Sequence, residues 1–275
     1  IDTAKALMVG NDDNRFADLV AGLAGERAFT PTRFRQLIAV PTTAGTGSEV
    51  TPWATVWDRE RQRKHSLHLP QTWPSAAVID PEIMLSLPAS VTLQSGLDAL
   101  SHALESIWNV NANPVSDTFA IAAVQEAMDT LPALMRNLGD VGLRGQMALA
   151  ALKAGMAFSN TKTALAHSIS YEMTLRHGLP HGIACSFVLP MVLERAIGRR
   201  ADRDAVLAAA LRTTPGAGLE AAPARLAAFM HALGVKTAFA DYGVGDDEAR
   251  QIVLHAEGGA RGRNFIGTAQ AEEVA

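Results

Sequence analysis

The sequence is poor in cysteine and has no surplus of positive charge. Cys185 is the only cysteine among 275 residues, which excludes an intrachain disulfide and any zinc site built from several cysteines. The formal net charge of -4 excludes the broad basic surface that nucleic-acid-binding proteins carry. Small acidic substrates stay possible, because a few local Arg or Lys side chains are enough to bind them.

Long apolar runs are also missing. The most apolar stretch, residues 183–193, is too short to span a bilayer and contains Pro190. The first residues have neither the basic start nor the apolar run of a signal peptide, so we expect a soluble, cytoplasmic protein without membrane partners. The composition itself, 48% hydrophobic and 19% charged, is that of a globular chain, and its length suffices for one large domain or two ordinary ones.

The pattern of the chain changes near residue 87. Before it, the apolar run 36–40 ends at Pro41 and reads as a buried strand, while residues 51–57 and 76–79 are further strand candidates and residues 1–9 are helix-like. After it come long Ala- and Leu-rich segments with helical spacing, separated by Pro- and Gly-containing turns. We therefore predict an α/β region over residues 1–87 and an all-helical domain over residues 88–275. Residues 1–6 look like the interior of a helix, with no capping residue before them.

One predicted helix, residues 93–109, carries a polar stripe beside its apolar face. Asp98, His102 and Glu105 fall on this stripe at positions i, i+4 and i+7. An Asp and a His four residues apart project side by side, so a carboxylate oxygen and an imidazole nitrogen can converge on one metal ion. Taken alone, such a pair is more often an ion pair on a helix surface.

Further along the chain, histidines gather in a second segment. His167 lies among small apolar residues, where a buried imidazole needs a partner, and His181 follows a Gly-Leu-Pro turn that can aim its ring inward. Three imidazole nitrogens together with Asp98 would form a four-ligand metal site with room for a substrate oxygen. The alternative is that His167 is a satisfied core histidine and that His177 and His181 are loop residues.

The segment 41–51 is a candidate ligand-binding loop. Its small residues let backbone N–H groups approach an anion, and its hydroxyls can donate to phosphate or ribose oxygens. It is neither a P-loop nor the dinucleotide fingerprint, because Gly45-x-Gly47 is followed by Val50 where the fingerprint needs Gly or Ala. A plain flexible turn is the alternative.

These motifs occur together in a familiar order. The run 41–51, Leu87-Pro88, the run 96–105, His167 and His181-Gly182 together resemble the iron-containing (group III) alcohol dehydrogenase family, over residues 1 to about 195. Within that family, the segments 64–67, 106–109, 166–171 and 262–265 look most like the phosphonoacetaldehyde reductase branch.

The resemblance implies a fold and a set of binding residues. The fold is the dehydroquinate synthase-like one: a Rossmann-like nucleotide domain followed by an all-helical metal-binding domain. The implied ligands of Fe(II), or else Zn(II), are Asp98, His102, His167 and His181, and the implied contacts to NAD or NADP are Thr42, Thr43, Thr46, Ser48 and Lys64. Residues 1–5 match the helix that follows a Gly-Gly-Gly-Ser pyrophosphate loop in the family, so we expect the N-terminal half of the nucleotide domain to be missing.

The resemblance also implies a reaction. We expect a metal-dependent, NAD(P)-linked alcohol dehydrogenase that works as an aldehyde reductase, in a homodimer, with phosphonoacetaldehyde reduced to 2-hydroxyethylphosphonate as the favoured reaction of phosphonate metabolism. The metal would polarise the aldehyde oxygen while the cofactor supplies hydride. Many relatives carry a further His where this chain has Tyr171, which makes Tyr171 a candidate for moving the proton.

A phosphonate substrate would need fixed cations near the metal. The candidates are Lys162, Arg176, His177, Arg261 and Arg263. We favour the pair Arg263 and Asn264, because the glycines of the run 258–267 let a loop fold over a site. Two other functions stay open: a broad short-chain alcohol or lactaldehyde dehydrogenase, and a non-catalytic metal-binding fragment that lacks cofactor binding.

Overall fold

The computed structural model describes residues 1–9, 16–26, 30–31, 33–58 and 63–268. Internal contacts divide the chain into two units. The first unit comprises residues 1–42 and 47–80, and the second comprises residues 43–46 and everything from Pro81 onward. The domain boundary expected near residue 87 lies a few residues after Pro81, where the long continuous part of the second unit begins.

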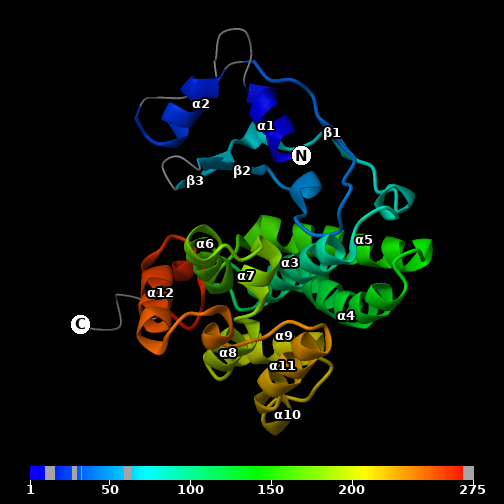
Figure 1. Ribbon diagram of the computed structural model, residues 1–275, viewed down its shortest axis with the longest axis vertical. Coiled ribbons are helices and arrows are strands. Elements are labelled where there is room, and N and C mark those ends of the chain that lie inside the picture. The colour runs from blue at the N-terminus through cyan, green and yellow to red at the C-terminus, as the bar shows by residue number, and fades with distance from the viewer. Residues whose placement is uncertain (10–15, 27–29, 32, 59–62, 269–275) are drawn as a thin grey trace. The chain divides into compact units, whose positions relative to one another are not determined.

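The first unit combines short helices with two small strand pairs (Figure 1). Its helices are α1 (Asp2–Val9) and α2 (Phe16–Leu23), with 3-10 turns η1 (Ser48–Val50) and η2 (Pro70–Thr72). Strand β1 (Ile38–Ala39) pairs in parallel with β4 (Ala76–Ala77), and β2 (Trp53–Asp58) pairs antiparallel with β3 (Arg63–His68). Parallel pairing between strands this far apart in sequence agrees with the predicted partial Rossmann-like domain.

A buried lysine ties α1 to the loop around η1. The ammonium of Lys5 donates to the carbonyl oxygens of Ser48 at 2.6 Å, Thr51 at 2.6 Å and Trp53 at 2.8 Å. Burial lowers the pKa of Lys5 to about 8, against the opposing effect of the nearby Asp2 carboxylate. Because backbone carbonyls need donors when they are buried, this single side chain fixes how the loop after residue 47 lies against α1.

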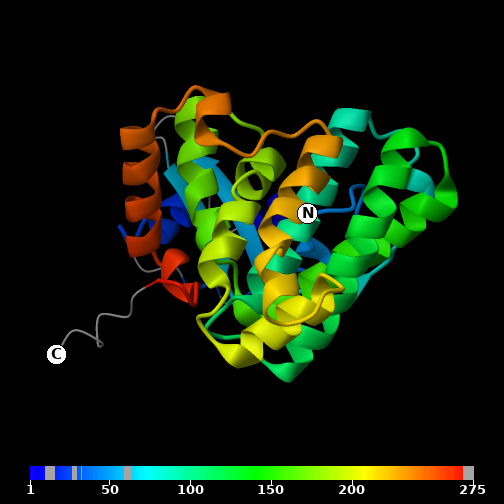
Figure 2. The same ribbon diagram turned by 90° about the horizontal axis from the view of Figure 1, so that it is seen from below.

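The described part of the second unit consists of helices, 3-10 turns and connecting loops, with an isolated β-bridge between Asn109 and Phe265, which agrees with the helical region that the sequence predicts after residue 88. Figure 2 shows its helices from the perpendicular direction, with the orange-red α12 beside α6. Its elements are η3 (Glu82–Met84), α3 (Ala89–Ile107), α4 (Pro114–Arg136), α5 (Val141–Thr161), α6 (Leu165–His177), α7 (His181–Ser186), α8 (Leu189–Ala196), α9 (Ala201–Ala210), α10 (Ala217–Glu220), α11 (Ala222–Ala232), η4 (Phe239–Tyr242), α12 (Asp246–Gly258) and η5 (Gly262–Asn264).

Helix α3 lies at the centre of this unit. Every residue from 96 to 109 is buried, and α3 packs against α4, α5, α6 and α7. The turns between helices follow the sequence signals: Asn113 caps α4 by accepting from the amides of Val115 and Ser116, with Pro114 at the first helical position. Among the described residues, no helix has the length and apolar character needed to cross a membrane.

Candidate metal centre

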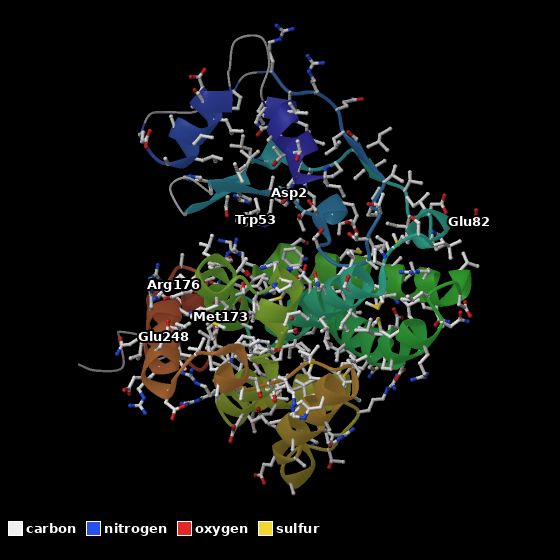
Figure 3. The ribbon with its side chains drawn as sticks, viewed as in Figure 1. Asp2, Trp53, Glu82, Met173, Arg176 and Glu248 are labelled. Carbon is white, nitrogen blue, oxygen red and sulfur yellow. The ribbon has the colours of Figure 1, made fainter. Side chains whose placement is uncertain are left out.

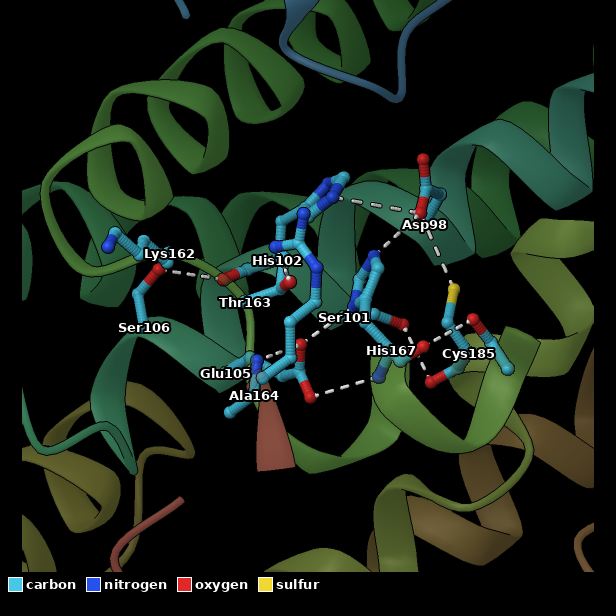
Figure 4. Close-up of polar contacts among 12 residues, drawn as sticks. Asp98, Ser101, His102, Glu105, Ser106, Lys162, Thr163, Ala164, His167 and Cys185 are labelled. Carbon is cyan, nitrogen blue, oxygen red and sulfur yellow. Dashed lines mark hydrogen bonds and ion pairs between the residues drawn. The ribbon is translucent and has the colours of Figure 1, made fainter. Parts of the chain in front are cut away.

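Three helices bring the four candidate metal ligands together around one carboxylate. Figure 4 shows three of them, Asp98, His102 and His167. Asp98 and His102 belong to α3, His167 to α6 and His181 to α7. The Nε2 atoms of His167, His102 and His181 lie 3.4, 3.9 and 3.9 Å from Asp98 Oδ1. Residues that are separated by more than 80 positions in the sequence thus converge on one carboxylate.

The local structure explains how each side chain reaches this point. The spacing of four on α3 places Asp98 and His102 on the same face. His181 is the first residue of α7, directly after the Gly-Leu-Pro turn, and His167 is the third residue of α6. Helix α7 packs on the backbone of α3 at Gly182, where a Cβ atom would stand 2.0 Å from the carbonyl oxygen of Gln94.

Burial and mutual charge set the protonation of the cluster. Asp98, His102 and His167 are buried, whereas the side chain of His181 is 34% exposed, so the cluster reaches solvent on the His181 side. Burial would raise the pKa of Asp98, but the surrounding imidazoles hold it well below its usual range. Burial lowers the pKa of His102 to about 3 despite the Asp98 charge. An ionised carboxylate and a neutral imidazole are the forms that bind metal ions.

A second carboxylate lies behind His167. Glu105 Oε2 accepts a hydrogen bond from Nδ1 of His167 at 2.7 Å. Burial by itself would lower the pKa of His167, but Glu105 and Asp98 together raise it. The sequence places Glu105 on the same stripe as Asp98 and His102, yet gives it no partner, because its contact with α6 spans more than 60 residues.

The donor set fits a divalent cation. Nε2 of His167 and Nδ1 of His102 are buried without a hydrogen-bond partner in the described part of the chain. One ligand atom from each of Asp98, His167, His181 and Cys185 lies within 4.8 Å of the other three, whereas His102 is not part of this closest group. Ligand atoms about 2.1 Å from a tetrahedral ion are about 3.4 Å apart, so a modest contraction would bring the cluster into a metal's coordination range.

Sequence reasoning missed Cys185, which it used only to exclude disulfides. Its thiol donates to Asp98 Oδ1 at 3.4 Å, and burial raises the pKa of Cys185 well above its usual value. The signal in the sequence was its position four residues after His181, which is one turn further along α7.

Tyr171 lies one turn after His167 on α6 and is half-buried. Burial raises the pKa of Tyr171 to about 12, although the positive charge of Arg261 and a hydrogen bond with Thr163 oppose this. Its hydroxyl therefore stays protonated near neutral pH and carries a proton that it can donate.

The residues proposed for the substrate lie in different surroundings. Arg263 is exposed and donates to the carbonyl of Gly258, while the Asn264 amide donates to the Thr163 carbonyl at 2.8 Å. His177 pairs with Glu248 on α12 at 3.3 Å. Lys162 is exposed at the end of α5 with a φ of 67°.

The two remaining candidate cations, Arg176 and Arg261, have different partners. Arg176 pairs with Glu248, and Figure 3 shows both side chains on the facing surfaces of α6 and α12. Arg261 instead donates from Nη1 to the hydroxyl of Thr163 at 2.6 Å, next to Tyr171. Among the candidate cations, Arg261 is therefore the one whose described contacts place it near Tyr171, one turn after the candidate ligand His167.

The proposed cofactor residues are divided between the two units. Thr42 and Thr46 are exposed and Thr43 is half-buried. Ser48 is buried, and its hydroxyl donates to Asp2 Oδ1 at 2.8 Å while accepting from Lys5. Lys64 lies in β3, and its side chain is outside the described part of the structure.

Two family models, both of iron-containing alcohol dehydrogenases, match different parts of the chain. The sequence model described as "Iron-containing alcohol dehydrogenase" matches residues 1–81. The model described as "Fe-containing alcohol dehydrogenase family, C-terminal" matches residues 92–274.

Individual relatives differ in how much of the chain they cover. The chain is 33% identical to the NAD-dependent methanol dehydrogenase of Bacillus methanolicus over 261 residues, which is 93% of this chain and 67% of that protein. It is 40% identical to the phosphonoacetaldehyde reductase of Streptomyces viridochromogenes over 164 residues, 60% of this chain but only 41% of that protein. The structure superposes on sulfoacetaldehyde reductase from Bifidobacterium kashiwanohense, solved with NAD+, with a TM-score of 0.85 and 27% identity over 96% of this chain and 68% of that one.

Proposed function

The chain belongs to the iron-containing alcohol dehydrogenase family. We propose that the protein is a metal-dependent, NAD- or NADP-linked alcohol dehydrogenase that works as an aldehyde reductase. The observation that carries the proposal is the convergence of three imidazoles on the Asp98 carboxylate; His102 and His167 are buried, and each has a ring nitrogen without a hydrogen-bond partner among the described residues. Asp98, His102, His167 and His181 would hold Fe(II), with Zn(II) as the alternative.

The chain's own residues suit this chemistry. When bound, a divalent cation supplies Lewis-acid polarisation of a carbonyl oxygen. The ring of Phe158 stacks on His102 with centroids 4.2 Å apart and closes one side of the cluster against water. The exposed side of His181 leaves an approach for a small substrate, and the protonated hydroxyl of Tyr171 is a donor on the same helix as His167.

Metal reconstitution tests the proposal. Metal-free protein would be loaded anaerobically with Fe(II) or with Zn(II), and both bound metal and NAD(P)H-dependent aldehyde reduction would be measured. We expect His181→Ala to bind both ions much more weakly than wild type and to lose the activity. His177→Ala is the matched control, because His177 lies four residues earlier and pairs with Glu248; it should keep both. A wild-type protein that binds neither ion with one-to-one stoichiometry would refute the proposal.

For the substrate, we propose phosphonoacetaldehyde. The resemblance to the phosphonoacetaldehyde reductase branch and the 40% identity to such a reductase support it. Arg261 supports it as well, because its guanidinium, held by Thr163 beside Tyr171, is a fixed cation of the kind that binds a dianion. The exposure of Arg263 makes it the less favoured anchor.

Paired arginine variants test this assignment. Arg261→Ala should raise the KM for phosphonoacetaldehyde about 10- to 100-fold, the range expected for one lost charge-assisted hydrogen bond. It should change the KM for propanal little, and Arg263→Ala should change neither. Equal effects of Arg261→Ala on both aldehydes would sink the role of Arg261.

A broad short-chain alcohol dehydrogenase is the second candidate. The longer match to methanol dehydrogenase, over 93% of this chain, favours it. A panel of phosphonoacetaldehyde, lactaldehyde and simple aldehydes with both cofactors separates the two functions.

The third candidate is a metal-binding fragment without cofactor binding. Titration with NADH and NADPH, followed by fluorescence, tests this candidate. We further propose a cytoplasmic homodimer, for which sedimentation velocity measures the mass.

A further inference from the structure

Glu105 is a buried carboxylate that the proposed reaction does not use. It lies on α3, three residues after His102, with no exposed surface. Oε2 accepts from Nδ1 of His167 at 2.7 Å and from the amide of Ala164 at 2.8 Å, and Oε1 accepts from the amide of His167 at 3.1 Å. All three donors belong to the start of α6.

The contact with the ring determines which nitrogen of His167 faces the cluster. A neutral imidazole carries one N–H and one lone pair. Because Nδ1 donates to Glu105, the lone pair belongs to Nε2, the atom that lies 3.4 Å from Asp98 Oδ1 and has no hydrogen-bond partner in the described structure. A carboxylate that accepts from the far nitrogen of a ligating histidine fixes its orientation and increases its basicity.

The contacts with the amides determine where the ring stands. Ala164 precedes the first residue of α6, and its side chain cannot cap the helix. Glu105 supplies the missing acceptor from α3, so that one side chain binds both the first turn of α6 and the ring that this turn carries. The helix that holds Asp98 and His102 is thereby joined to the helix that holds His167.

We propose that Glu105 is a positioning residue of the metal centre: it holds His167 in the tautomer and orientation that present Nε2 to the ion. This inference rests on the proposed function, because it takes His167 to be a ligand. Glu105 itself is not a ligand here, since both of its oxygens are occupied by N–H donors of α6.

The substitution Glu105→Gln separates this role from simple helix capping. Glutamine has the same length, but its amide NH₂ replaces one acceptor oxygen and faces an N–H donor in either orientation. Where the amide oxygen faces Nδ1, the ring keeps its tautomer but loses the carboxylate charge that increases its basicity. Where the NH₂ faces Nδ1, the ring must accept there, and the proton moves to Nε2, the atom needed by the metal. Ser106→Ala is the matched control: Ser106 is the next residue on α3, fully buried, and its hydroxyl binds only the His102 carbonyl among the described contacts.

The experiment is a double-mutant cycle on Zn(II) affinity, measured by competition with a chromogenic chelator on wild type, Glu105→Gln, His167→Ala and the double variant. Glu105→Gln should weaken Zn(II) binding about 10- to 100-fold. In the His167→Ala background the same change should alter affinity less than about twofold, because the ring through which Glu105 acts is gone. Ser106→Ala should bind like wild type, and the visible absorption spectrum of Co(II)-loaded Glu105→Gln should differ from that of wild type.

Each outcome decides the matter. Unchanged affinity in Glu105→Gln, or an equal loss with and without the His167 ring, would overturn the positioning role while leaving the metal proposal intact. No Zn(II) binding by wild type would overturn both. Circular dichroism and the thermal midpoint of the metal-free proteins check folding. Should Glu105→Gln not fold, Glu105→Asp takes its place: it keeps the charge but is too short to reach the ring, so wild-type affinity in that variant would equally overturn the inference.

Discussion

Gly182 is the position where a single methyl group should displace a metal ligand. A Cβ atom there would lie 2.0 Å from the carbonyl oxygen of Gln94, whereas real Cβ atoms essentially never approach within 3.0 Å. The substitution Gly182→Ala must therefore separate α7 from α3 by 3.0 − 2.0, or about 1 Å, at this point. Gln94 lies one turn before Asp98, and His181 adjoins Gly182. The displacement is thus directed between two ligands whose bonds to a metal tolerate only about 0.2 Å.

Zn(II) affinity, measured by chelator competition, tests this reasoning. We expect Gly182→Ala to weaken binding about 10- to 100-fold, comparable to the loss of a group that orients a ligand. Gly178→Ala is the matched control: Gly178 ends α6 with a φ of 69° and has no atom near its absent Cβ. Alanine there should lower stability by about 1 kcal/mol without changing Zn(II) affinity. Wild-type affinity in Gly182→Ala would refute the displacement.

Four further predictions concern stability and reactivity. Lys5→Met leaves two buried carbonyls and one part-buried carbonyl without their donor and should lower the free energy of unfolding by about 2–3 kcal/mol in urea titrations. The folded-state pKa of Lys5, about 8, is below its ordinary value of 10.5, so the unfolded chain binds more protons between these pH values; wild-type stability should gain a contribution from pH 8 to 10.5 that Lys5→Met lacks. Arg144→Met removes hydrogen bonds to the Thr92 hydroxyl and two carbonyls and should cost about 2–4 kcal/mol, read as a lower urea midpoint. Cys185, buried and with a raised pKa, should react with iodoacetamide far more slowly in the native protein than in urea, as mass spectrometry would detect.

The sequence was informative wherever the cause of the structure is local. A spacing of four residues on one helix is enough to place Asp98 beside His102, and Asn113-Pro114 is enough to begin α4. The apolar runs ending at Pro41 and at Asp80-Pro81 likewise contain the two parallel strands β1 and β4. The expectation that the first run is a buried strand is wrong, because Ile38 and Val40 are exposed and only Ala39 between them is buried. In each case, periodicity or capping within a few residues decides the outcome.

The sequence could not predict which partners a side chain meets where two similar residues lie close together in the chain. His177 and His181 carry the same signal, yet one faces Glu248 on α12 and the other faces Asp98. Arg261 and Arg263 are two residues apart, and only the path of the chain into η5 sends the first toward Thr163 and leaves the second exposed. Such differences depend on long-range packing, which no pattern within a single segment records.

The geometry of the site should depend most on where α6 and α7 begin, because their ligands are the third and first residues of these helices. Two Gly→Ala substitutions should then differ in their effect on Zn(II) affinity, because one added methyl group contacts a side chain and the other contacts backbone. A Cβ on Gly96, only two residues before Asp98, would meet the end of the Leu131 side chain at 2.6 Å, which can rotate away at modest cost. A Cβ on Gly182 meets backbone, which cannot move without moving a helix. We therefore expect Gly96→Ala to retain far more Zn(II) affinity than Gly182→Ala, although Gly96 belongs to the same helix as two of the ligands; the opposite order would show that α3, rather than the start of α7, controls the centre.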